Sequence, residues 1–221
     1  MRATEFLSCC RALPDGFITL GTGQSWRLGA VAFVRSGENF AVVQKAARTS
    51  YEFSDLWALP GGMVRLPKGD EPSIDRLEGA VRSRINQEAG LILNELDPVA
   101  LGPIVTTYVA KGRSRTTLVA VFAGQTSHPE TLTANDSTIQ TVAWSSALAT
   151  PALFAPANQL ILAHLLWFAL SDEARLQMKV DLQPALHACT EAAECAGIVA
   201  PELPWAEENA LECWRNAWPE I

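Results

Sequence analysis

Length, composition and charge place the chain among globular proteins and exclude several other classes. It has 221 residues, of which 48% are hydrophobic and 19% are charged. Such a chain can bury a core and is too apolar to be disordered throughout. The formal net charge of -7 argues against binding to nucleic acid or to an anionic membrane, because both need a basic surface. No apolar run reaches the ~20 residues of a membrane-spanning helix.

The cysteines and the N-terminus predict a cytoplasmic protein. The five cysteines have no regular spacing and lie toward the two ends of the sequence, at Cys9, Cys10, Cys189, Cys195 and Cys213. We expect reduced thiols, because a chain of this size does not need disulfides. A zinc site formed by the last three with His187 stays open, although the usual short paired spacings are missing. The N-terminus lacks the charged start and the sustained apolar stretch of a signal peptide, so none is predicted.

The chain begins with an extension over residues 1–25, in which Pro14-Asp15-Gly16 predicts a turn and residues 17–20 a strand. Whether this extension pairs with the main sheet or with a second subunit stays open. A hairpin follows, with strands at residues 28–34 and 40–44.

The stretch from Trp57 to Leu91 organises the rest of the sequence. Adjacent glycines in Pro60-Gly61-Gly62 predict a turn with close backbone approach. After a polar loop, apolar residues recur at helical spacing from Ile74 to Ile85. Ser73 is a suitable N-cap and Gly90 a suitable stop for this helix.

The remaining elements are mostly strands, followed by helices. Extended segments are predicted at residues 99–101, 104–110, 116–123 and 139–144. Helices are predicted at residues 158–170, 172–180, 183–196 and 205–218. The first part of the chain therefore predicts several antiparallel strands with one long inserted helix.

The order of these motifs resembles a Nudix hydrolase. The resemblance covers residues 26–170: a hairpin, Trp57-x-Leu-Pro-Gly-Gly62, a helix, Glu88-x-Gly-Leu91, further strands and Val142-Ala-Trp144. It implies an α/β (α+β) fold with a Nudix-like mixed β-sheet sandwiched by helices. We therefore expect a Nudix-like domain at residues 26–171 and a helical C-terminal extension, packed on it, at residues 172–221. A homodimer formed through the extensions is expected.

The family's sequence box, Gly-x5-Glu-x7-Arg-Glu-U-x-Glu-Glu-x-Gly-U with U apolar, fits this chain only in part. Its end falls on Glu88, Gly90 and Leu91. Four earlier box positions differ. The first Glu of the box is Asp75 here and the Arg is Ser83, and the two Glu that follow the Arg are Arg84 and Gln87. Thirteen positions separate Gly62 from Asp75 where the pattern has six, so the loop is seven residues longer.

The resemblance implies hydrolysis with Mg²⁺ or Mn²⁺, for which the family's helix gathers carboxylates at i, i+3 and i+4. Here those positions hold Arg84, Gln87 and Glu88, a single carboxylate. Glu88 is the candidate catalytic residue. The candidate metal ligands are Glu88, Gln87 and Gly62, and the nearest further acid is Asp136, on a loop.

Three interpretations of the helix stay open. Catalysis survives with fewer metals, helped by a carboxylate of the helix start or the enlarged loop, namely Asp75, Glu78, Asp70 or Glu71. Alternatively the fold is a binding module in which Arg84 contacts a phosphate. In the third interpretation, Arg84 and Glu88 only form an ion pair at i and i+4.

The candidate substrate-binding residues are Arg65, Arg84, Tyr51, Gly61 and Gly62. Tyr51, Phe53 and Trp57 would stack on a base or would simply belong to the core. Lys45, Arg48 and Arg65 would meet phosphates or would remain solvated. No histidine has the neighbours that catalysis requires.

The function predicted first is a divergent Nudix-type hydrolase that cleaves a phosphoanhydride bond in a nucleoside diphosphate-linked small molecule. The alternative is a catalytically silent Nudix-fold protein that binds a nucleotide or metabolite. The expected partner in both cases is a nucleotide-like small molecule, with no nucleic acid and no membrane.

Overall fold

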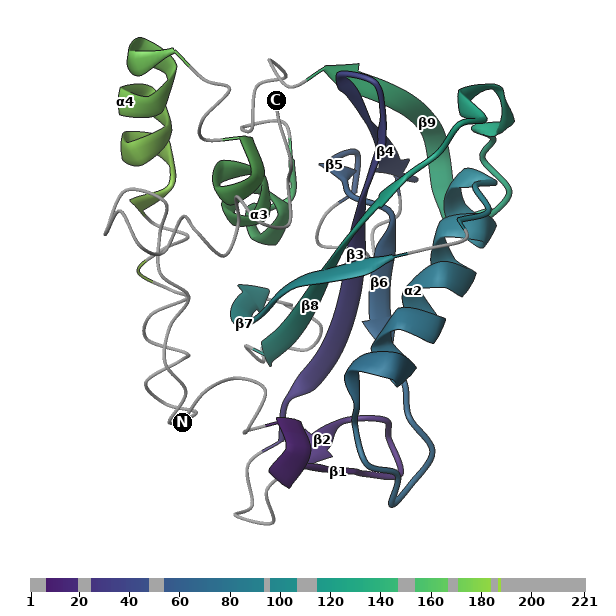
Figure 1. Ribbon diagram of the computed structural model, residues 1–221. Coiled ribbons are helices and arrows are strands. Elements are labelled where there is room, and N and C mark those ends of the chain that lie inside the picture. The colour runs from purple at the N-terminus through teal and green to yellow at the C-terminus, as the bar shows by residue number, and fades with distance from the viewer. Residues whose placement is uncertain are drawn as a thin grey trace.

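The computed structural model describes residues 7–19, 25–47, 54–93, 96–106, 115–146, 154–166, 171–183 and 187. A seven-stranded mixed sheet forms the centre, with helices on its faces, as the sequence predicted (Figure 1). The strands of this sheet are β3 (Arg27–Ser36), β4 (Asn39–Lys45), β5 (Trp57–Ala58), β6 (Gly61–Val64), β7 (Asp97–Thr106), β8 (Arg115–Gln125) and β9 (Ile139–Ser146).

Strand β3 lies in the middle of the sheet and has three partners. It pairs in parallel with β8, from Arg27 opposite Thr117 to Arg35 opposite Gln125. It pairs in antiparallel fashion with the start of β4 and with β6. The pattern of the strands predicted several antiparallel pairings, and the parallel pair of β3 and β8 makes the sheet mixed, as the resemblance implied. Parallel strands need a long crossover connection, and the chain between these two contains the helix α2 (Ile74–Ala89).

The Pro-Gly-Gly stretch is a step between two strand pairings, not the turn that the sequence predicted. Before it β5 pairs with β4, and after it β6 pairs with β3. Gly61 has φ of 139°, and a Cβ atom there would lie 2.3 Å from the carbonyl oxygen of Ala30. Only glycine fits so close to β3.

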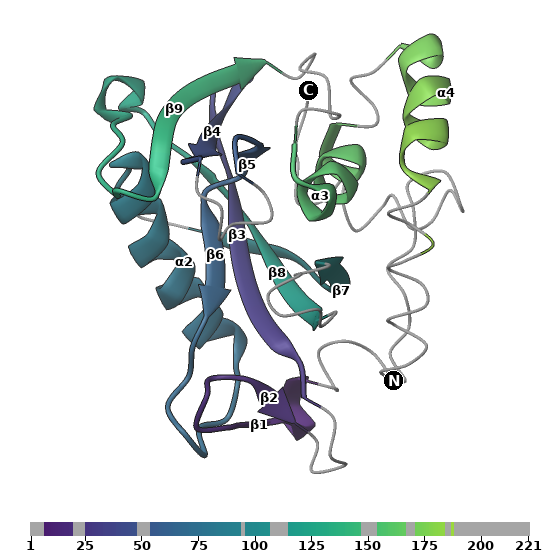
Figure 2. The same cartoon turned by 180° about the vertical axis from the view of Figure 1, so that it is seen from behind.

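Helices cover both faces of the sheet. Helix α2 lies on one face and buries Leu77, Val81 and Ile85, which confirms the predicted apolar spacing. Ser73 caps its start and Gly90, with φ of 70°, ends it, also as predicted. Helix α3 (Pro156–Leu166) lies on the opposite face, as both views show (Figures 1 and 2).

The described part of the N-terminal extension forms a sheet of its own and does not join the seven-stranded sheet. Strands β1 (Arg11–Ala12) and β2 (Ile18–Thr19) form a small separate sheet. The amide of Ala12 donates to the carbonyl of Asp70 at 3.0 Å, and the amide of Gly69 donates to the carbonyl of Ala12 at 2.8 Å. The hairpin is therefore docked on the enlarged loop that precedes α2.

The described part of the C-terminal region adds a helix to α3. Helix α4 (Asp172–Asp181) packs on α3 through Leu160, Ala163, Met178 and Leu182. Nearly all of the further predicted helices at 183–196 and 205–218 lie outside the described residues. Among the residues that are described, no helix is long and apolar enough to cross a membrane.

Two of the five cysteines are described, and both are free thiols. Cys9 is exposed, whereas Cys10 is buried under the N-terminal hairpin. Burial raises the pKa of the Cys10 thiol to about 11, so it stays protonated at neutral pH. The three cysteines of the conceivable zinc site lie outside the described residues.

Candidate functional site

Glu88 lies in the last turn of α2 and is held by two partners. Its exposed fraction is 2%. One carboxylate oxygen, Oε1, accepts a hydrogen bond from Lys45 Nζ at 2.8 Å, and Oε2 accepts one from the amide of Gly61 at 3.0 Å. A buried carboxylate needs such compensation, because its transfer out of water is otherwise unfavourable by several kcal/mol. Glu88 thus joins the helix to β4 and to the start of β6.

Lys45 ends β4 on the face of the strand that carries Ala41 and Val43. Those two residues belong to the core cluster that includes the apolar face of α2. Because side chains alternate between the faces of a strand, Lys45 also points towards this helix. The sequence predicted Lys45 just after the strand, as a phosphate-binding or solvated cation, and did not predict Glu88 as its partner. The two residues of the pair are 43 positions apart, and no local pattern connects them.

Arg84, one turn earlier on α2, faces Asp136 instead of Glu88. Its Nη1 lies 3.7 Å from Asp136 Oδ2. The third interpretation, an ion pair between Arg84 and Glu88, does not hold, because each side chain faces an oppositely charged residue from another element. The helix backbone allows an i and i+4 contact, but Lys45 already lies against the Glu88 carboxylate.

Asp136 is fixed by the backbone that follows it. Its Oδ1 accepts a hydrogen bond from the amide of Thr138 at 2.7 Å. The pKa of Asp136 lies below its usual value, first because of hydrogen bonds from Thr138 and then because of the positive charges of Arg84 and Lys45. Asp136 is thus a carboxylate at neutral pH and lies within the field of both cations.

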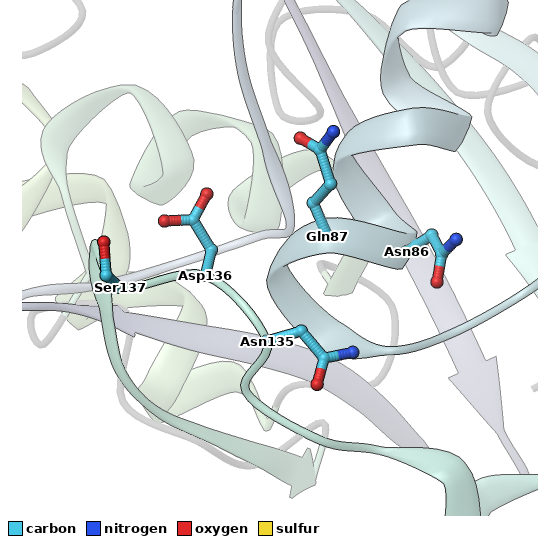
Figure 3. A pocket seen from close by; sticks show the side chains of 5 residues that line it. All are labelled: Asn86, Gln87, Asn135, Asp136 and Ser137. Carbon is cyan, nitrogen blue, oxygen red and sulfur yellow. The ribbon is translucent and has the colours of Figure 1, made fainter.

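An open polar pocket lies between the end of α2 and the loop before β9. Its volume is about 590 Å³. Its lining residues are Asn86, Gln87, Asn135, Asp136 and Ser137 (Figure 3). Three of these five side chains carry amides, each with donors and an acceptor. Four of the five residues are exposed and Asp136 is half-buried, so the pocket is a polar hollow at the surface.

The residues around Glu88 do not fit the expected Mg²⁺ or Mn²⁺ site. Such cations need several oxygen ligands, usually including more than one carboxylate. Both oxygens of Glu88 already accept hydrogen bonds, and its nearest charged neighbour is an ammonium group. Across the described ranges, no group of three or more His, Cys, Asp or Glu side chains stands together. Of the other two proposed ligands, Gln87 lines the pocket, and Gly62 lies in β6 opposite Ala30.

The carboxylates of the enlarged loop and helix start lie at the other end of α2. Asp75 precedes Glu88 by thirteen residues, which corresponds to roughly 20 Å along a helix. Asp70 pairs with Arg76, Glu71 with Arg11 and Glu78 with Arg82. These four carboxylates therefore lie too far from Glu88 to share a metal ion with it. The first interpretation, catalysis with fewer metals, can no longer rely on them.

The predicted substrate-binding residues do not form one group. Arg84 lies next to the pocket residue Gln87, one helical turn away, and Gly61 contacts Glu88. Arg65 is exposed beside Gly16, at the N-terminal hairpin. Tyr51 lies outside the described residues, with Arg48 and Phe53. Trp57 packs against the core between the sheet and α3, beside residues such as Phe40 and Leu162, which supports its interpretation as a core residue.

Comparisons with known proteins find similarity in fold. At the level of sequence, no protein-family model matches the chain, and no curated protein matches it either. Among solved structures, a MutT Nudix hydrolase from Burkholderia pseudomallei is 19% identical, with 63% of this chain and 97% of that chain covered at a TM-score of 0.46. The MutT protein from Methanosarcina mazei Go1 is 13% identical, with 72% and 96% covered at a TM-score of 0.47.

A third similar structure is the Nudix domain of Shewanella oneidensis NrtR, complexed with ADP-ribose. It is 19% identical, with 66% of this chain and 84% of that chain covered at a TM-score of 0.41. These proteins bear the name of the family that the motif order of this sequence resembles. At such identities and TM-scores the likeness carries no argument about activity, so the function is inferred below from the site.

Proposed function

We propose that the protein binds a nucleotide-like small molecule on a Nudix-like scaffold and does so without a divalent cation. The observation that supports this most strongly is the ammonium group of Lys45, 2.8 Å from the carboxylate of Glu88. It supplies the positive charge that would otherwise come from a metal ion. A divalent cation entering there would be repelled by Lys45 and, nearby, by Arg84.

The ligand class follows from the groups around the pocket. Arg84 and Lys45 keep exposed fractions of 42% and 24%, so part of each cation is accessible to an anionic group. The amides of the pocket would hydrogen-bond to a base or a sugar. A phosphate-bearing molecule of nucleotide type satisfies both sets of groups.

The test measures binding and turnover on the same samples. Calorimetry with ADP-ribose, ADP and a nucleoside diphosphate sugar would be run in EDTA and then with Mg²⁺ or Mn²⁺. We include ADP-ribose because it is the ligand named for the Shewanella structure. The expected result is an affinity in EDTA that does not increase when metal is added, without release of phosphate or of a nucleoside monophosphate.

Two results would reject this proposal. Binding that requires added metal would show that a cation is needed after all. Turnover that disappears in Glu88→Gln would favour the divergent hydrolase, with Glu88 as ligand or base. A matched control is Glu173→Gln, which removes a carboxylate from the exposed first turn of α4 and is expected to change neither measurement.

A further inference from the structure

We propose that Asp136 occupies the place on Arg84 that a phosphate group of the ligand takes, so that binding requires the ligand to displace an internal carboxylate. This inference rests on the proposed function and names the residue that recognises the phosphate. It also assigns Asp136 a role as an internal competitor.

Arg84 has most of its hydrogen-bonding capacity unused. A guanidinium group carries five N–H donors. Within the described part of the chain, the only ion pair or hydrogen bond found for its side chain is the contact with Asp136, and at 3.7 Å this is longer than a hydrogen bond. The other helix arginines differ: Arg82 donates to both Glu78 and the carbonyl of Leu93, and Arg76 lies 2.5 Å from Asp70. Arg84 is therefore the helix cation best able to accept a new anionic partner.

Asp136 is anchored and does not need Arg84 to stay in place. The amide of Thr138 holds one of its oxygens, as an Asx turn does. When a ligand draws Arg84 away, the Asp136 carboxylate keeps this hydrogen bond and remains partly exposed. Displacement of the contact therefore leaves no buried charge without a partner.

The position of the pair favours a phosphate from a molecule seated in the pocket. Asp136 lines the pocket, and Gln87, one turn after Arg84, lines it from the helix (Figure 3). Planar guanidinium groups bind phosphate through two parallel hydrogen bonds, a stronger arrangement than a single long ion contact. A phosphate at this edge would thus gain more from Arg84 than Asp136 does.

A double-mutant cycle tests the competition. Binding of inorganic pyrophosphate and of ADP-ribose to the full chain in EDTA would be measured for wild type, Asp136→Asn, Arg84→Gln and the double variant. Asparagine keeps an oxygen for the Thr138 amide and loses only the charge. We expect Asp136→Asn to tighten binding by about fivefold and Arg84→Gln to weaken it by about tenfold or more.

The double variant separates displacement from a general charge effect. If Asp136 competes for Arg84, its replacement gains nothing once Arg84 is absent, so the double variant binds like Arg84→Gln. If Asp136 merely repels the ligand through space, the fivefold gain persists in that background and the inference is overturned. Matched controls are Asp172→Asn and Arg175→Gln, a pair on α4 with the same charges, 3.2 Å apart.

Failure of this inference can be told from failure of the proposed function. If neither ligand binds wild type in EDTA, the proposed function is wrong. If wild type binds both ligands and Arg84→Gln binds as tightly as Arg175→Gln, the function stands and the role of Arg84 is rejected. If Asp136→Asn leaves the affinity unchanged while Arg84→Gln weakens binding, the role of Asp136 as a competitor is rejected and the role of Arg84 stands.

Discussion

The two ends of helix α2 are held by different forces. At the start, backbone hydrogen bonds join the enlarged loop to the N-terminal hairpin, and the ion pairs there lie at the surface. At the end, the buried carboxylate of Glu88 is shared between Lys45 and the amide of Gly61. We therefore expect the start of α2 to tolerate changes in its charges. The end should depend on the particular pair of Lys45 and Glu88.

The two departures from the Nudix box that the sequence predicted fall at these two ends of the helix. The longer loop is a docking surface for the extension, since Gly69 and Asp70 bind Ala12. The replaced carboxylates lie at the opposite end, where Arg84 faces Asp136 and Lys45 faces Glu88. The long loop at one end and the group of Arg84, Gln87 and Glu88 at the other are thus separate features, and only the second concerns the candidate site.

The largest effect is expected at Gly61, on which the Glu88 end of the helix depends. Gly61→Ala places a Cβ atom 2.3 Å from the Ala30 carbonyl oxygen, at a φ of 139° that a side chain rarely adopts. The combined clash and strain should lower the free energy of unfolding by about 3 to 5 kcal/mol. Urea unfolding followed by circular dichroism measures this.

A glycine in the same helix provides the control. Gly79 is exposed and would place its Cβ atom in open space, so Gly79→Ala should stabilise the protein by about 0.5 to 1 kcal/mol. A loss of less than 1 kcal/mol in Gly61→Ala would contradict the close contact between β6 and β3.

The next largest effect concerns the charge pair itself. Lys45→Met leaves the carboxylate of Glu88, whose side chain is only 3% exposed, without its cation and should cost about 3 kcal/mol. Glu88→Gln leaves Lys45, which is 24% exposed and can turn towards water. The glutamine oxygen can still accept a hydrogen bond from the amide of Gly61. The expected loss in the free energy of unfolding is therefore only about 1 to 2 kcal/mol. Urea unfolding at neutral pH compares them.

The double variant shows whether the two effects share one interaction. Lys45→Met with Glu88→Gln should cost less than the sum of the single changes, because no buried charge remains. Strict additivity would mean that the two side chains act separately, and the contrast between the ends of α2 would weaken.

A smaller effect is expected at the other end of the helix. Ser73 Oγ accepts a hydrogen bond from the amide of Arg76, and its removal in Ser73→Ala should cost about 1 kcal/mol. Ser73→Asp keeps an acceptor and adds a negative charge at the helix start, so it should stay close to wild type. If alanine and aspartate destabilise equally, the cap is not what holds this turn.

The sequence predicted the features that depend on local chemistry. The spacing of Leu77, Val81 and Ile85 determines the buried face of α2, and Ser73 and Gly90 mark its ends through their own backbone preferences.

The features that were missed depend on contacts between distant segments. Nothing near Lys45 indicates that Glu88, 43 positions away, is its partner, and nothing near Ala12 indicates its pairing with Asp70. The parallel pairing of β3 with β8 joins strands separated by a helix and by other strands. Tertiary structure decides these partners, so a motif can locate Glu88 without showing which charge compensates it.

The smallest effect is expected for the surface ion pair between the hairpin and the loop. Arg11 lies 3.1 Å from Glu71, with exposed fractions of 52% and 71%. Exposed pairs of this kind are worth at most about 0.5 to 1 kcal/mol, and Arg11→Gln should fall at the low end. The hairpin has stronger attachments, because Ala12 and Gly69 exchange backbone hydrogen bonds with the facing segment and Ile18 is fully buried.

Amide hydrogen exchange distinguishes these attachments residue by residue. Protection of the Ala12 and Gly69 amides should be unchanged in Arg11→Gln, because both hydrogen bonds lie within the backbone. Ala12→Asp is the contrasting variant: it places a charge at a buried position and should abolish protection at both amides. If Arg11→Gln alone removed that protection, charge would hold the start of α2 as it holds the end, and the contrast between them would disappear.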